Sequence, residues 1–502
     1  MPTQHDQSIV DNLEVAWAHL GISSGDLDMP DLISHADIEF DWEAYRNKLI
    51  ERIRDGVIGP LQLDVVDLPK DALNVRPLVR MLPSDRLIYD AAVFATADKI
   101  AAAFPRGVYS YRWWKARKAL LGANMWIKMQ RSARFLHEKH PELLLARTDV
   151  TAFYENIESG ILMEDVEALG VPSWSTSTLR KCLSSFNSKT GVWGIPQGSD
   201  ASGLLANLYL FPLDNEISRR GFRHYRYSDD IYIFGEDWVA LREMLLEANR
   251  ILRYRHLTLS GAKTTIYRSR EIGDVFEDDE KDAIGYGVRN LDVGSIEDLH
   301  ALFDRTTGRY PINGRDLRYC LTKLAAVYDD YAAAWLLANL GDLPHIARES
   351  LIYLGNLPWL SPYITKAVVD LLVNSKLVMY PYAEQHLLIY MINHEAFSKD
   401  GLKAAWELLL DKNKAGFVRE FAARYIGVAS QPGSALRLKQ EFQLEKDQGV
   451  RRALLIACYE SGQCTERWLN EVWKSVPDLR LTAKYLLANP SQIPRPVTER
   501  RY

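Results

Sequence analysis

The chain has 502 residues, of which 47% are hydrophobic and 25% charged, so it is long and apolar enough for two or three domains. Its formal net charge of −5 would be unusual for a protein that binds nucleic acid if the charge were evenly spread, which it is not. The four cysteines form no Cys-x-x-Cys pair, which predicts a reduced, cytoplasmic protein without a zinc site. We expect no export and no membrane contact, because the sequence shows no signal peptide and no apolar run near the ~18 residues of a membrane span.

The N-terminal segment, residues 1–45, contains many acids but no lysine or arginine. Apolar residues at helical spacing predict short helices within it, one of them over residues 9–20. An acidic arm of this kind fits a cover over a basic groove or a neighbouring subunit, and it fits a solvated helical extension equally well. The next segment, residues 41–58, is predicted to be one helix, and residues 74–104 contain RPL followed by PSDRLIYDA.

A basic and aromatic stretch occupies residues 109–139. Between Tyr111 and Lys139 it holds eight lysines or arginines and one acid, with three tryptophans interleaved. Positive charge that follows phosphates and rings that stack on bases are what single-stranded nucleic acid binding requires. The candidate nucleic-acid-binding residues are Arg112, Trp113, Lys115, Arg117 and Lys118. The alternative is a pair of amphipathic helices that bury the tryptophans, and both interpretations stay open.

Three motifs follow along the chain. An apolar run at Leu143–Leu145 leads into Asp149, which predicts a strand with an acid at its end and a helical pattern after it. Residues 194–210, GIPQGSDASGLLANLYL, predict a tight turn followed by a helix that opens with small residues. Further on, LTLSGAKTTIY places Lys263 after a short strand.

The stretch Phe222–Phe234, FRHYRYSDDIYIF, predicts a β-hairpin with Asp229 and Asp230 at its tip. Adjacent aspartates repel each other, and a divalent cation explains the pair because hard Mg²⁺ prefers carboxylate oxygens. For this pair taken alone, a solvated Asp-Asp turn is the simpler interpretation. Asp149 changes that assessment, because an acid at the end of a strand can meet the hairpin carboxylates around shared metal ions.

These motifs, in this order, resemble the palm of reverse transcriptases. DVTAFYENI resembles motif A, GIPQGSDASGLLAN motif B, YSDD motif C and LSGAKT motif D, and AIGYGV at Ala283–Val288 resembles the strand of motif E. Each motif alone is weak, whereas their order and spacing together are specific. The resemblance implies an α+β fold with right-hand polymerase fingers over residues 46–142 and a palm over residues 143–294.

The resemblance also implies the chemistry of the site. In polymerisation a hydroxyl attacks the α-phosphate of a nucleoside triphosphate, and two metal ions held by carboxylates stabilise the attacking and leaving oxygens. Asp149 and Asp229 correspond to the principal metal ligands, Asp230 assists them, and the carbonyl of Val150 completes the coordination. The cofactor implied is Mg²⁺, as two ions, with Mn²⁺ as a substitute.

The nucleotide contacts are carried over in the same way. Arg76 and Arg80 correspond to arginines that hold triphosphate oxygens, with ordinary surface salt bridges as the alternative. Tyr154 corresponds to the side chain under the sugar, where a ring excludes a 2′-hydroxyl and selects dNTPs, with a place in the palm core as the alternative. Gln197 corresponds to the glutamine that contacts the nucleotide, and Lys263 to a catalytic lysine that protonates or neutralises the leaving pyrophosphate.

Residues 295–502 are predicted to form an all-α C-terminal domain in place of a short thumb. An arginine followed by an apolar face recurs near Arg348, Arg419, Arg451 and Arg480, the last three about thirty residues apart. That period indicates stacked helical pairs of HEAT-like type, because such repeats bury their apolar faces only against their neighbours. The expected fold class is therefore α+β fingers and palm followed by an all-α HEAT-like helical-repeat domain.

This architecture resembles the Abi class of abortive-infection reverse transcriptases, which act in bacterial defence against phage. Members of that class make DNA without a template, prime it on a protein hydroxyl and form oligomers. The resemblance therefore implies dNTPs as substrates, a single-stranded DNA product attached covalently to the protein, and a homo-oligomer. Tyr45, where the acidic arm meets the first fingers helix, is the candidate for the priming hydroxyl, although for this residue taken alone packing against that helix is the better explanation.

Two other functions stay open. One is an RNA-templated enzyme similar to those of retrons or group II introns, in which the helical domain serves as thumb and RNA binder. The other is a non-enzymatic helical-repeat scaffold that carries a retired palm. The intact cluster of Asp149, Asp229 and Asp230 argues against the scaffold, because an unused site has no reason to keep carboxylates that are costly to bury together.

Overall fold

The computed structural model describes residues 4–71, 73–122, 124–191, 194–276, 279–374, 380–429 and 436–499. The chain forms two compact units, and each unit takes three segments of the sequence. The first unit comprises Met1–Asp26, Arg46–Val65 and Leu78–Asp278, and the second comprises Leu27–Tyr45, Val66–Pro77 and Asp279–Tyr502. The motifs between residues 149 and 263 therefore all belong to the first unit.

A four-stranded antiparallel sheet forms the centre of the first unit, with the strand order β6-β7-β5-β8. Its strands are β5 (Leu144–Asp149), β6 (Arg223–Tyr227), β7 (Asp230–Gly235) and β8 (Thr265–Tyr267). β6 and β7 form the predicted hairpin, and β7 pairs with β5 so that Asp149 lies directly opposite Asp230. Directly opposed residues of an antiparallel pair project to the same face of the sheet, so the register itself brings these two carboxylates together.

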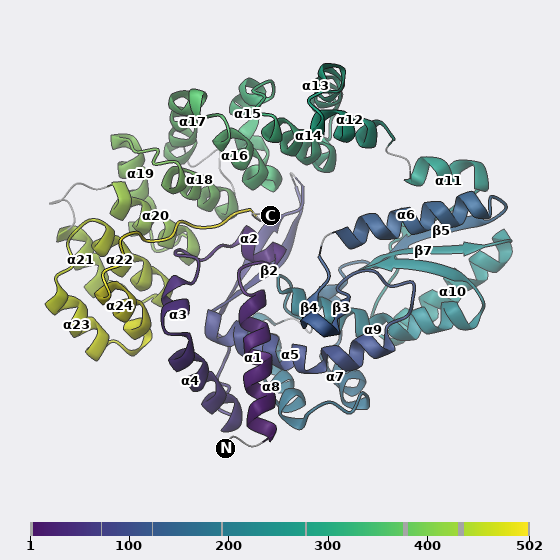
Figure 1. The fold of residues 1–502 in the computed structure, drawn as a ribbon, viewed down its shortest axis with the longest axis horizontal. Coiled ribbons are helices and arrows are strands. Elements are labelled where there is room, and N and C mark those ends of the chain that lie inside the picture. Colours follow the sequence, from purple (N-terminus) through teal and green to yellow (C-terminus); the bar gives the residue numbers. More distant parts are fainter. Residues whose placement is uncertain are drawn as a thin grey trace. The chain divides into compact units, whose positions relative to one another are not determined.

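Helices cover both faces of this sheet (Figure 1). On one face lie α6 (Asn124–Lys139) and α11 (Ser269–Phe276), and α9 (Asp200–Arg219) and α10 (Trp238–Tyr254) pack against β6 and β7. The core on the α6 side joins Met129 and Leu136 of α6 to Tyr232 and Phe234 of β7 and to Ile272 of α11. The alternation along β7, with residues 232 and 234 on this side, is the period of a strand that is covered on both faces.

Several helices of the first unit pack around α5. α5 (Pro83–Ala103) begins with a proline in its first turn and packs against α1 (Gln4–His19), α8 (Ser173–Thr190) and α9. The remaining helix of this group is α7 (Ser159–Ala168), which contacts α8 and α9. Most of α5 is buried, in keeping with the alanines that let neighbouring helices approach it closely.

Two short hairpins precede the central sheet. β1 (Leu63–Pro69) pairs with β2 (Val75–Met81), and β2 leads into α5. β3 (Trp113–Trp114) pairs with β4 (Ala119–Leu120). The alternative of two amphipathic helices in the basic stretch is therefore wrong in part, because a hairpin precedes the single helix α6. Strands of two residues are too short to show a periodicity that distinguishes them from a helix.

The sequence predicts a motif E strand at Ala283–Val288, and this prediction is wrong. These residues lie in α12 (Asp279–Arg289), a helix of the second unit that packs on α13 (Val293–Thr307). Ile284 and Val288, four positions apart, are both buried, which is the spacing of one face of a helix.

The glycines of that segment also have a helical explanation. A Cβ added to Gly287 would lie 1.8 Å from the hydroxyl of Ser295 in α13, so glycine is required where the two helices touch. The pattern of apolar residues alternating with glycine suggested a strand, although here it reflects close helix packing.

The elements of the second unit from α12 onward that the structure describes are all helical. After α13 they are α14 (Gly314–Ala326), α15 (Ala333–Asn339), α16 (Ala347–Gly355), α17 (Ser361–Val373), α18 (Pro381–Asn393), α19 (Lys399–Leu410), α20 (Gly416–Ala429), α21 (Leu436–Leu444), α22 (Gln448–Glu460), α23 (Glu466–Ser475) and α24 (Arg480–Leu487). Among the described helices, none combines the length and the apolar character needed to cross a membrane.

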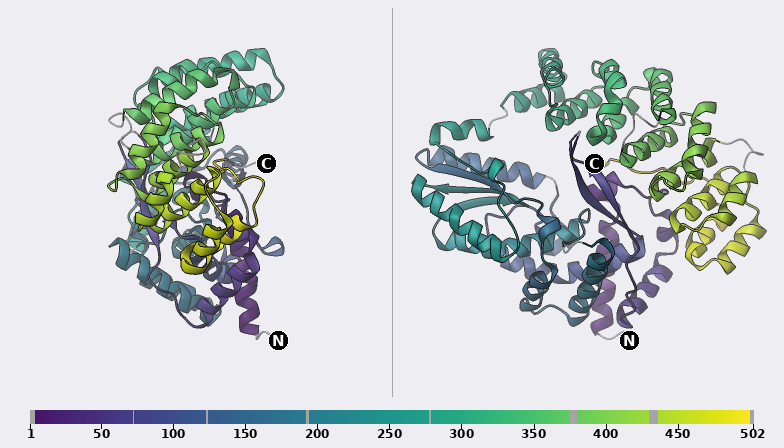
Figure 2. Two further views of the ribbon diagram at one scale, coloured as in Figure 1. Left: turned by 90° about the vertical axis from the view of Figure 1, so that its left-hand side faces the viewer. Right: turned by 180° about the vertical axis from the view of Figure 1, so that it is seen from behind.

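These helices stack in a regular way (Figure 2). The even-numbered helices α14 to α24 contact one another in succession, and α17, α19, α21 and α23 each pack on the helix that follows. The four arginines of the recurring sequence pattern, Arg348, Arg419, Arg451 and Arg480, all lie on helices of the even-numbered row. α18 belongs to the same row but lacks the pattern, which explains why the sequence did not reveal this helix as a repeat.

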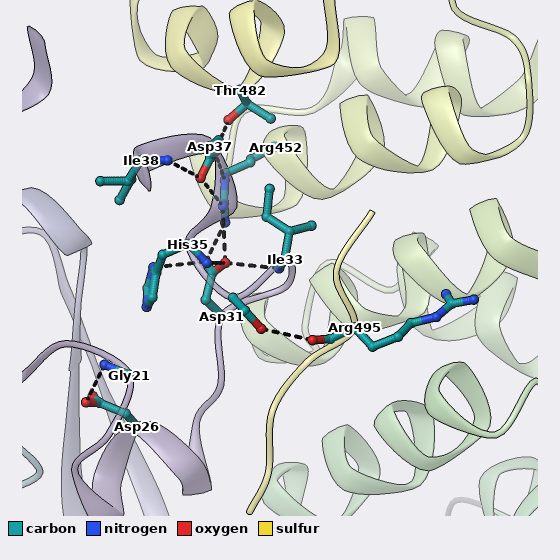
Figure 3. Close-up of polar contacts among 11 residues, drawn as sticks. Gly21, Asp26, Asp31, Ile33, His35, Asp37, Ile38, Arg452, Thr482 and Arg495 are labelled. Carbon is teal, nitrogen blue, oxygen red and sulfur yellow. Dashed lines mark hydrogen bonds and ion pairs between the residues drawn. The ribbon is translucent and has the colours of Figure 1, made fainter. Parts of the chain in front are cut away.

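The second half of the acidic arm belongs to this unit and includes α3 (Ala36–Phe40) and parts of α2 (Ser24–Asp28) and α4 (Trp42–Arg54). Figure 3 shows the guanidinium of Arg452, from α22, between Asp31 and Asp37. Its nitrogens lie 2.6 Å from Asp31 and 3.0 Å from Asp37.

Two further pairs repeat this arrangement along the arm. Arg348 of α16 donates to Asp28 at 2.6 Å, and Lys484 of α24 donates to Asp41 at 2.5 Å. The second half of the acidic arm therefore forms ion pairs with arginine and lysine side chains of its own chain.

Candidate active site

Three carboxylates lie where β5, β7 and the hairpin turn meet. Asp149 ends β5, Asp230 begins β7 directly opposite it, and Asp229 stands in the turn between β6 and β7. Ser228, just before it, has a φ of 55°, a left-handed conformation that closes the turn. The backbone N–H of Val150 donates to the carbonyl of Asp229 at 3.3 Å and joins the turn to the end of β5. The structure thus brings together the four residues that the sequence proposes as metal ligands.

The charge at this place is only partly compensated. The pKa of Asp229 is raised to about 6, first by burial and also by the negative charges of Asp149 and Asp230. Lys263, from the turn Gly261–Lys263, counteracts this shift, and its ammonium donates to Oδ2 of Asp149 at 2.7 Å. The Lys263 side chain is 56% exposed whereas that of Asp149 is 8% exposed, so the lysine reaches the cluster from the solvent side.

The donor set fits a divalent cation. Carboxylate oxygens of three aspartates and the carbonyl of Val150 are hard ligands, and a bound cation would relieve the repulsion that raises the pKa of Asp229. The ammonium of Lys263 shows that a positive charge is accommodated beside Asp149. Across the part of the chain that the structure describes, no three acidic, histidine or cysteine side chains form a ready-made metal site. The three aspartates are therefore neighbours, but their side chains are not already placed around one point as the ligands of a metal ion are.

A buried polar network holds the hairpin turn from behind. The hydroxyl of Ser110 accepts from the backbone N–H of Ser228 at 2.8 Å, and Nη1 of Arg226 donates to the carbonyl of Ser228 at 2.9 Å. Arg226 and its partner Asp214 are both fully buried, 2.6 Å apart, and Asn207 accepts from Arg226 and from Ser110. The turn that carries Asp229 is thus fixed on both sides of its backbone.

Sequence reasoning missed this network. Asn207 and Asp214 are seven positions apart, which places them on one face of α9, and Arg226 lies two positions before the turn. A polar pair on an otherwise apolar helix face was the available signal, but nothing in the sequence links it to Ser110, which is 97 positions away from Asn207.

Tyr154 lies close to the carboxylates. Burial raises the pKa of the Tyr154 hydroxyl, and the nearby charge of Asp229 raises it further. The turn at the start of the GIPQG segment packs on it so closely that a Cβ on Gly194 would lie 2.4 Å from the Tyr154 carbonyl. The structure therefore places Tyr154 near the turn that carries Asp229.

Gln197 and Arg80 also belong to the first unit. The carbonyl of Gln197 accepts from the backbone N–H of Val79 at 2.7 Å, which attaches the GIPQG turn to β2. Arg80, the next residue on β2, is 23% exposed and lies 3.9 Å from Asp64. This long ion pair is compatible with the alternative of a surface salt bridge.

Arg76 and Tyr45 belong to the second unit, whereas the carboxylates belong to the first. Arg76 is exposed on β2, where its charge lowers the pKa of Asp28 slightly against the larger effect of burial. Tyr45 lies in α4 with its ring 6.5 Å from that of Trp42.

The basic stretch divides into packed and exposed residues. Trp113 stacks on Phe94 at 5.6 Å and its indole N–H donates to Asp98 at 2.8 Å, so it is held against α5. Arg112 donates to the carbonyl of Val108 at 2.7 Å. Trp113 is therefore packed, as the alternative interpretation expects, whereas nucleic-acid binding by this stretch stays a prediction.

The exposed part consists of the residues that follow Trp113. Trp114 is 43% exposed with the guanidinium of Arg117 4.3 Å from its ring centre. Lys115 is 79% exposed and lies 3.6 Å from Asp98, and Lys118 is 57% exposed. An exposed ring with basic neighbours is a surface on which a base and its phosphates can be accommodated.

Comparison with known proteins agrees with the motifs. Residues 72–288 match the family model described as reverse transcriptase (RNA-dependent DNA polymerase). Domains of this family act on nucleotides and nucleic acid with divalent metal ions. No curated protein matches the chain significantly.

Among solved structures, two telomerases are similar to this chain at low TM-scores. One is telomerase from Candida albicans in complex with the TWJ fragment of telomeric RNA, with 13% identity, a TM-score of 0.29 and coverage of 62% of this chain and 63% of that chain. The other is apo telomerase from Candida tropicalis, with 11% identity, a TM-score of 0.34 and coverage of 83% and 74%. The chain thus spans less than two thirds of the first of these proteins. Residues 72–288 of this chain carry a reverse transcriptase domain.

Proposed function

We propose that this chain is a reverse transcriptase-like DNA polymerase that joins deoxynucleotides at Asp149, Asp229 and Asp230. The observation that carries the proposal is the register that sets Asp149 opposite Asp230, with Asp229 in the adjoining turn and the ammonium of Lys263 beside them. The family match of residues 72–288 supports it.

Each proposed role follows from a local environment. The three carboxylates and the Val150 carbonyl would hold Mg²⁺, as two ions, or Mn²⁺ in its place, and such ions stabilise charge on the attacking and leaving oxygens of phosphoryl transfer. Lys263, exposed and bonded to Asp149, is in a position to give a proton or a positive charge to the departing pyrophosphate.

The nucleotide is proposed to lie against the residues next to this cluster. Tyr154 excludes a 2′-hydroxyl, so the substrates are dNTPs, and Gln197 contacts the incoming nucleotide. Arg80 and Arg76 bind triphosphate oxygens, for which a guanidinium is suited by its paired donors.

The exposed residues of the basic stretch are proposed to bind the nucleic acid strand. Lys115, Arg117 and Lys118 supply positive charge, and Arg112 and Trp113 support them from the packed part of the stretch. This division of roles follows from their exposure.

We further propose that the enzyme belongs to the Abi class and acts in abortive-infection defence in the cytoplasm. In this proposal it makes DNA without a template, primes it on one of its own hydroxyls, with Tyr45 as the candidate, and works as a homo-oligomer. The stacked rows of helices in the second unit are then HEAT-like repeats. The support for these finer statements is the order of the motifs and the helical rows that follow the palm.

An RNA-templated polymerase is the second candidate. The description of the matching family, an RNA-dependent DNA polymerase, favours it. In this case the helical unit serves as the thumb that grips a primer duplex.

One incubation separates the two candidates. The full-length protein is mixed with labelled dNTPs and Mg²⁺, with and without an RNA template and DNA primer, then denatured and separated on a protein gel. We expect label without template that migrates with the protein. Label that appears only with RNA, free of protein, would select the second candidate, and no label under any condition would reject a polymerase.

A further inference from the structure

The first half of the acidic arm, up to Asp26, belongs to the first unit and lies against the GIPQG turn. Ser23, which is 1% exposed, donates its hydroxyl hydrogen to the Gly198 carbonyl at 3.1 Å. A Cβ on Gly25 would lie 2.5 Å from the same carbonyl oxygen, so glycine is needed where the two backbones meet. The arm and the turn are 175 positions apart in the sequence, and the fold brings them into direct contact.

The GIPQG turn forms neither helix nor strand, so contacts from other segments fix its backbone. Near its start, the backbone N–H of Ile195 donates to the Tyr154 carbonyl at 3.0 Å, and further on the Gln197 carbonyl accepts from Val79 of β2. At its end, Gly198 has a φ of 126°, a conformation that favours glycine. The arm therefore holds the end of the turn, as the Tyr154 carbonyl and β2 hold its earlier part.

Asp26 keeps this part of the arm in one conformation. Its Oδ2 accepts from the backbone N–H groups of Gly21, at 3.0 Å, and Ser23, at 3.3 Å, and the contact with Gly21 is drawn in Figure 3. Its Oδ1 accepts from Nη1 of Arg86 in α5 at 2.9 Å. Arg86 is only 7% exposed, so solvent screens this ion pair little. The position of the Ser23 hydroxyl is thus fixed relative to α5.

The same guanidinium leads back to the turn. Nε of Arg86 donates to Asp90 at 2.6 Å, and Asp90 accepts from the hydroxyl of Ser199 at 2.7 Å. Ser199 caps α9, because its hydroxyl also accepts from the backbone N–H of Ala201 at 3.1 Å. The arm, α5 and the start of α9 therefore form one closed hydrogen-bonded ring that includes the Gly198 peptide.

We propose that residues 21–26 complete the nucleotide site, with Ser23 as a positioning residue that holds the Gly198 peptide and thereby directs the neighbouring Gln197 side chain. This inference rests on the proposed function of the site, in which Gln197 contacts the incoming nucleotide. A contact that is held ready in the free enzyme strengthens binding in the ground state and in the transition state alike. Loss of the Ser23 hydroxyl therefore weakens nucleotide binding more than it slows the chemical step.

The test is Ser23→Ala in the full-length protein, which removes only the hydroxyl. Steady-state constants are measured with a labelled dNTP and Mg²⁺. We expect KM for the dNTP to rise about fivefold, the effect of one net hydrogen bond, while kcat stays that of the wild type. An unchanged KM, or a fall in kcat at unchanged KM, would overturn the proposal.

Ser8→Ala is the matched control. Ser8 lies in α1 of the same arm, and its hydroxyl accepts from the indole N–H of Trp174 in α8 at 3.3 Å. This variant also loses a hydroxyl contact between the arm and the first unit, but at a distance along the arm from the residues that touch the GIPQG turn. It is expected to leave KM unchanged. An equal rise in both variants would show that any loosening of the arm has this effect, and would contradict a specific role for Ser23.

A second variant tests the same contact without removing the hydroxyl. Gly25→Ala introduces a Cβ that forces the backbones of the arm and of Gly198 apart, so KM should rise at least as far as in Ser23→Ala. Its control is Gly59→Ala, where an added Cβ would meet nothing within 4 Å in the described part of the chain. Equal KM values for the two glycine variants would overturn the proposal, and this pair decides the matter if Ser23→Ala does not fold by circular dichroism.

A double-mutant cycle tests whether Ser23 acts through Gln197. Gln197→Ala removes the nucleotide contact itself, so its KM should rise at least as far as that of Ser23→Ala. Because the arm acts on this side chain, Ser23→Ala combined with Gln197→Ala should behave as Gln197→Ala alone. Effects that multiply would contradict the proposal.

The outcomes distinguish this inference from the proposed function. A wild type that incorporates no nucleotide rejects the polymerase itself. A wild type that incorporates dNTPs, with Gln197→Ala raising KM while Ser23→Ala and Gly25→Ala leave it unchanged, keeps the polymerase and rejects the role of the arm.

Discussion

The two units of the protein place buried aspartates in opposite environments. In the first unit Asp229 faces two other carboxylates, and burial with their repulsion raises its pKa to about 6. In the second unit burial alone would raise the pKa of Asp31 as well, but Arg452 and the hydrogen bonds from His35 hold it far below its ordinary value.

Burial alone therefore does not distinguish a candidate active-site carboxylate from a structural one. Asp31 has an arginine as its partner, and its charge is stabilised without any further ligand. Asp229 lies beside two like charges, and the positive charge of Lys263 offsets their repulsion only in part. Incompletely compensated negative charge is the feature that marks the candidate active site.

The largest effect is expected from Asp229→Asn, which removes the central carboxylate of the first unit. Removing a metal ligand takes away charge stabilisation of the transferring phosphoryl group, so dNTP incorporation should fall about a thousandfold, roughly 4 kcal/mol. Incorporation is measured with labelled dNTP and Mg²⁺, and the circular dichroism spectrum should match that of the wild type. Near wild-type incorporation by a folded variant would remove Asp229 from the mechanism.

In the second unit, the corresponding test is the substitution Arg452→Ala. Asp31 and Asp37 are then left buried without their cation, which should lower the free energy of unfolding by about 3 kcal/mol. Urea unfolding followed by circular dichroism measures this loss.

Arg467→Ala is the control for that variant. Arg467 pairs with Glu471, but the two side chains are 89% and 60% exposed, so the change should cost less than about 0.5 kcal/mol. If both variants lost the same small amount, the acidic arm would not depend on Arg452.

The pH dependence of stability sharpens the comparison. Because the pKa of Asp229 is raised from 3.8 to about 6 on folding, the protonated carboxyl contributes stability that is present below pH 3.8 and lost as the pH rises through 6. In EDTA, the wild type and Asp229→Asn should differ little near pH 4, and the variant should be more stable at pH 8 by up to about 3 kcal/mol. Urea unfolding at both pH values measures the difference, and a pH-independent difference would contradict the raised pKa.

The smallest expected effect concerns the sugar. Tyr154→Val removes the ring beside the catalytic turn, and the preference for dNTP over rNTP should fall about tenfold, as for other pockets that gain space for one small group. The ratio of kcat/KM values measures the preference. An unchanged ratio would make Tyr154 a core residue.

The sequence allowed the local parts of the site to be predicted. The hairpin with its acids, the strand that ends at Asp149 and the helix after GIPQG all depend on neighbours along the chain, and the structure has each of them. The helical character of the C-terminal half was predictable for the same reason, because amphipathic periodicity is a local property.

The parts that were missed depend on long-range contacts. Ser110 and Tyr111 were included only in a basic, aromatic stretch, although Ser110 holds the turn at Ser228 and the Tyr111 ring packs on Gly203 of α9. The error at Ala283–Val288 has the same origin, since the close contact of Gly287 with Ser295 is invisible in a pattern of apolar residues and glycines.

Direct measurement of cation binding tests the central claim most sharply. Mn²⁺ is titrated into the full-length protein at pH 8, and free Mn²⁺ is followed by electron paramagnetic resonance for the wild type, for Asp229→Asn and for Asp41→Asn, whose carboxylate is already paired with Lys484. We predict that the wild type and Asp41→Asn bind Mn²⁺ equally and that Asp229→Asn loses this binding. Equal binding by all three proteins would contradict the account, because the aspartate cluster of the first unit would then have no special role.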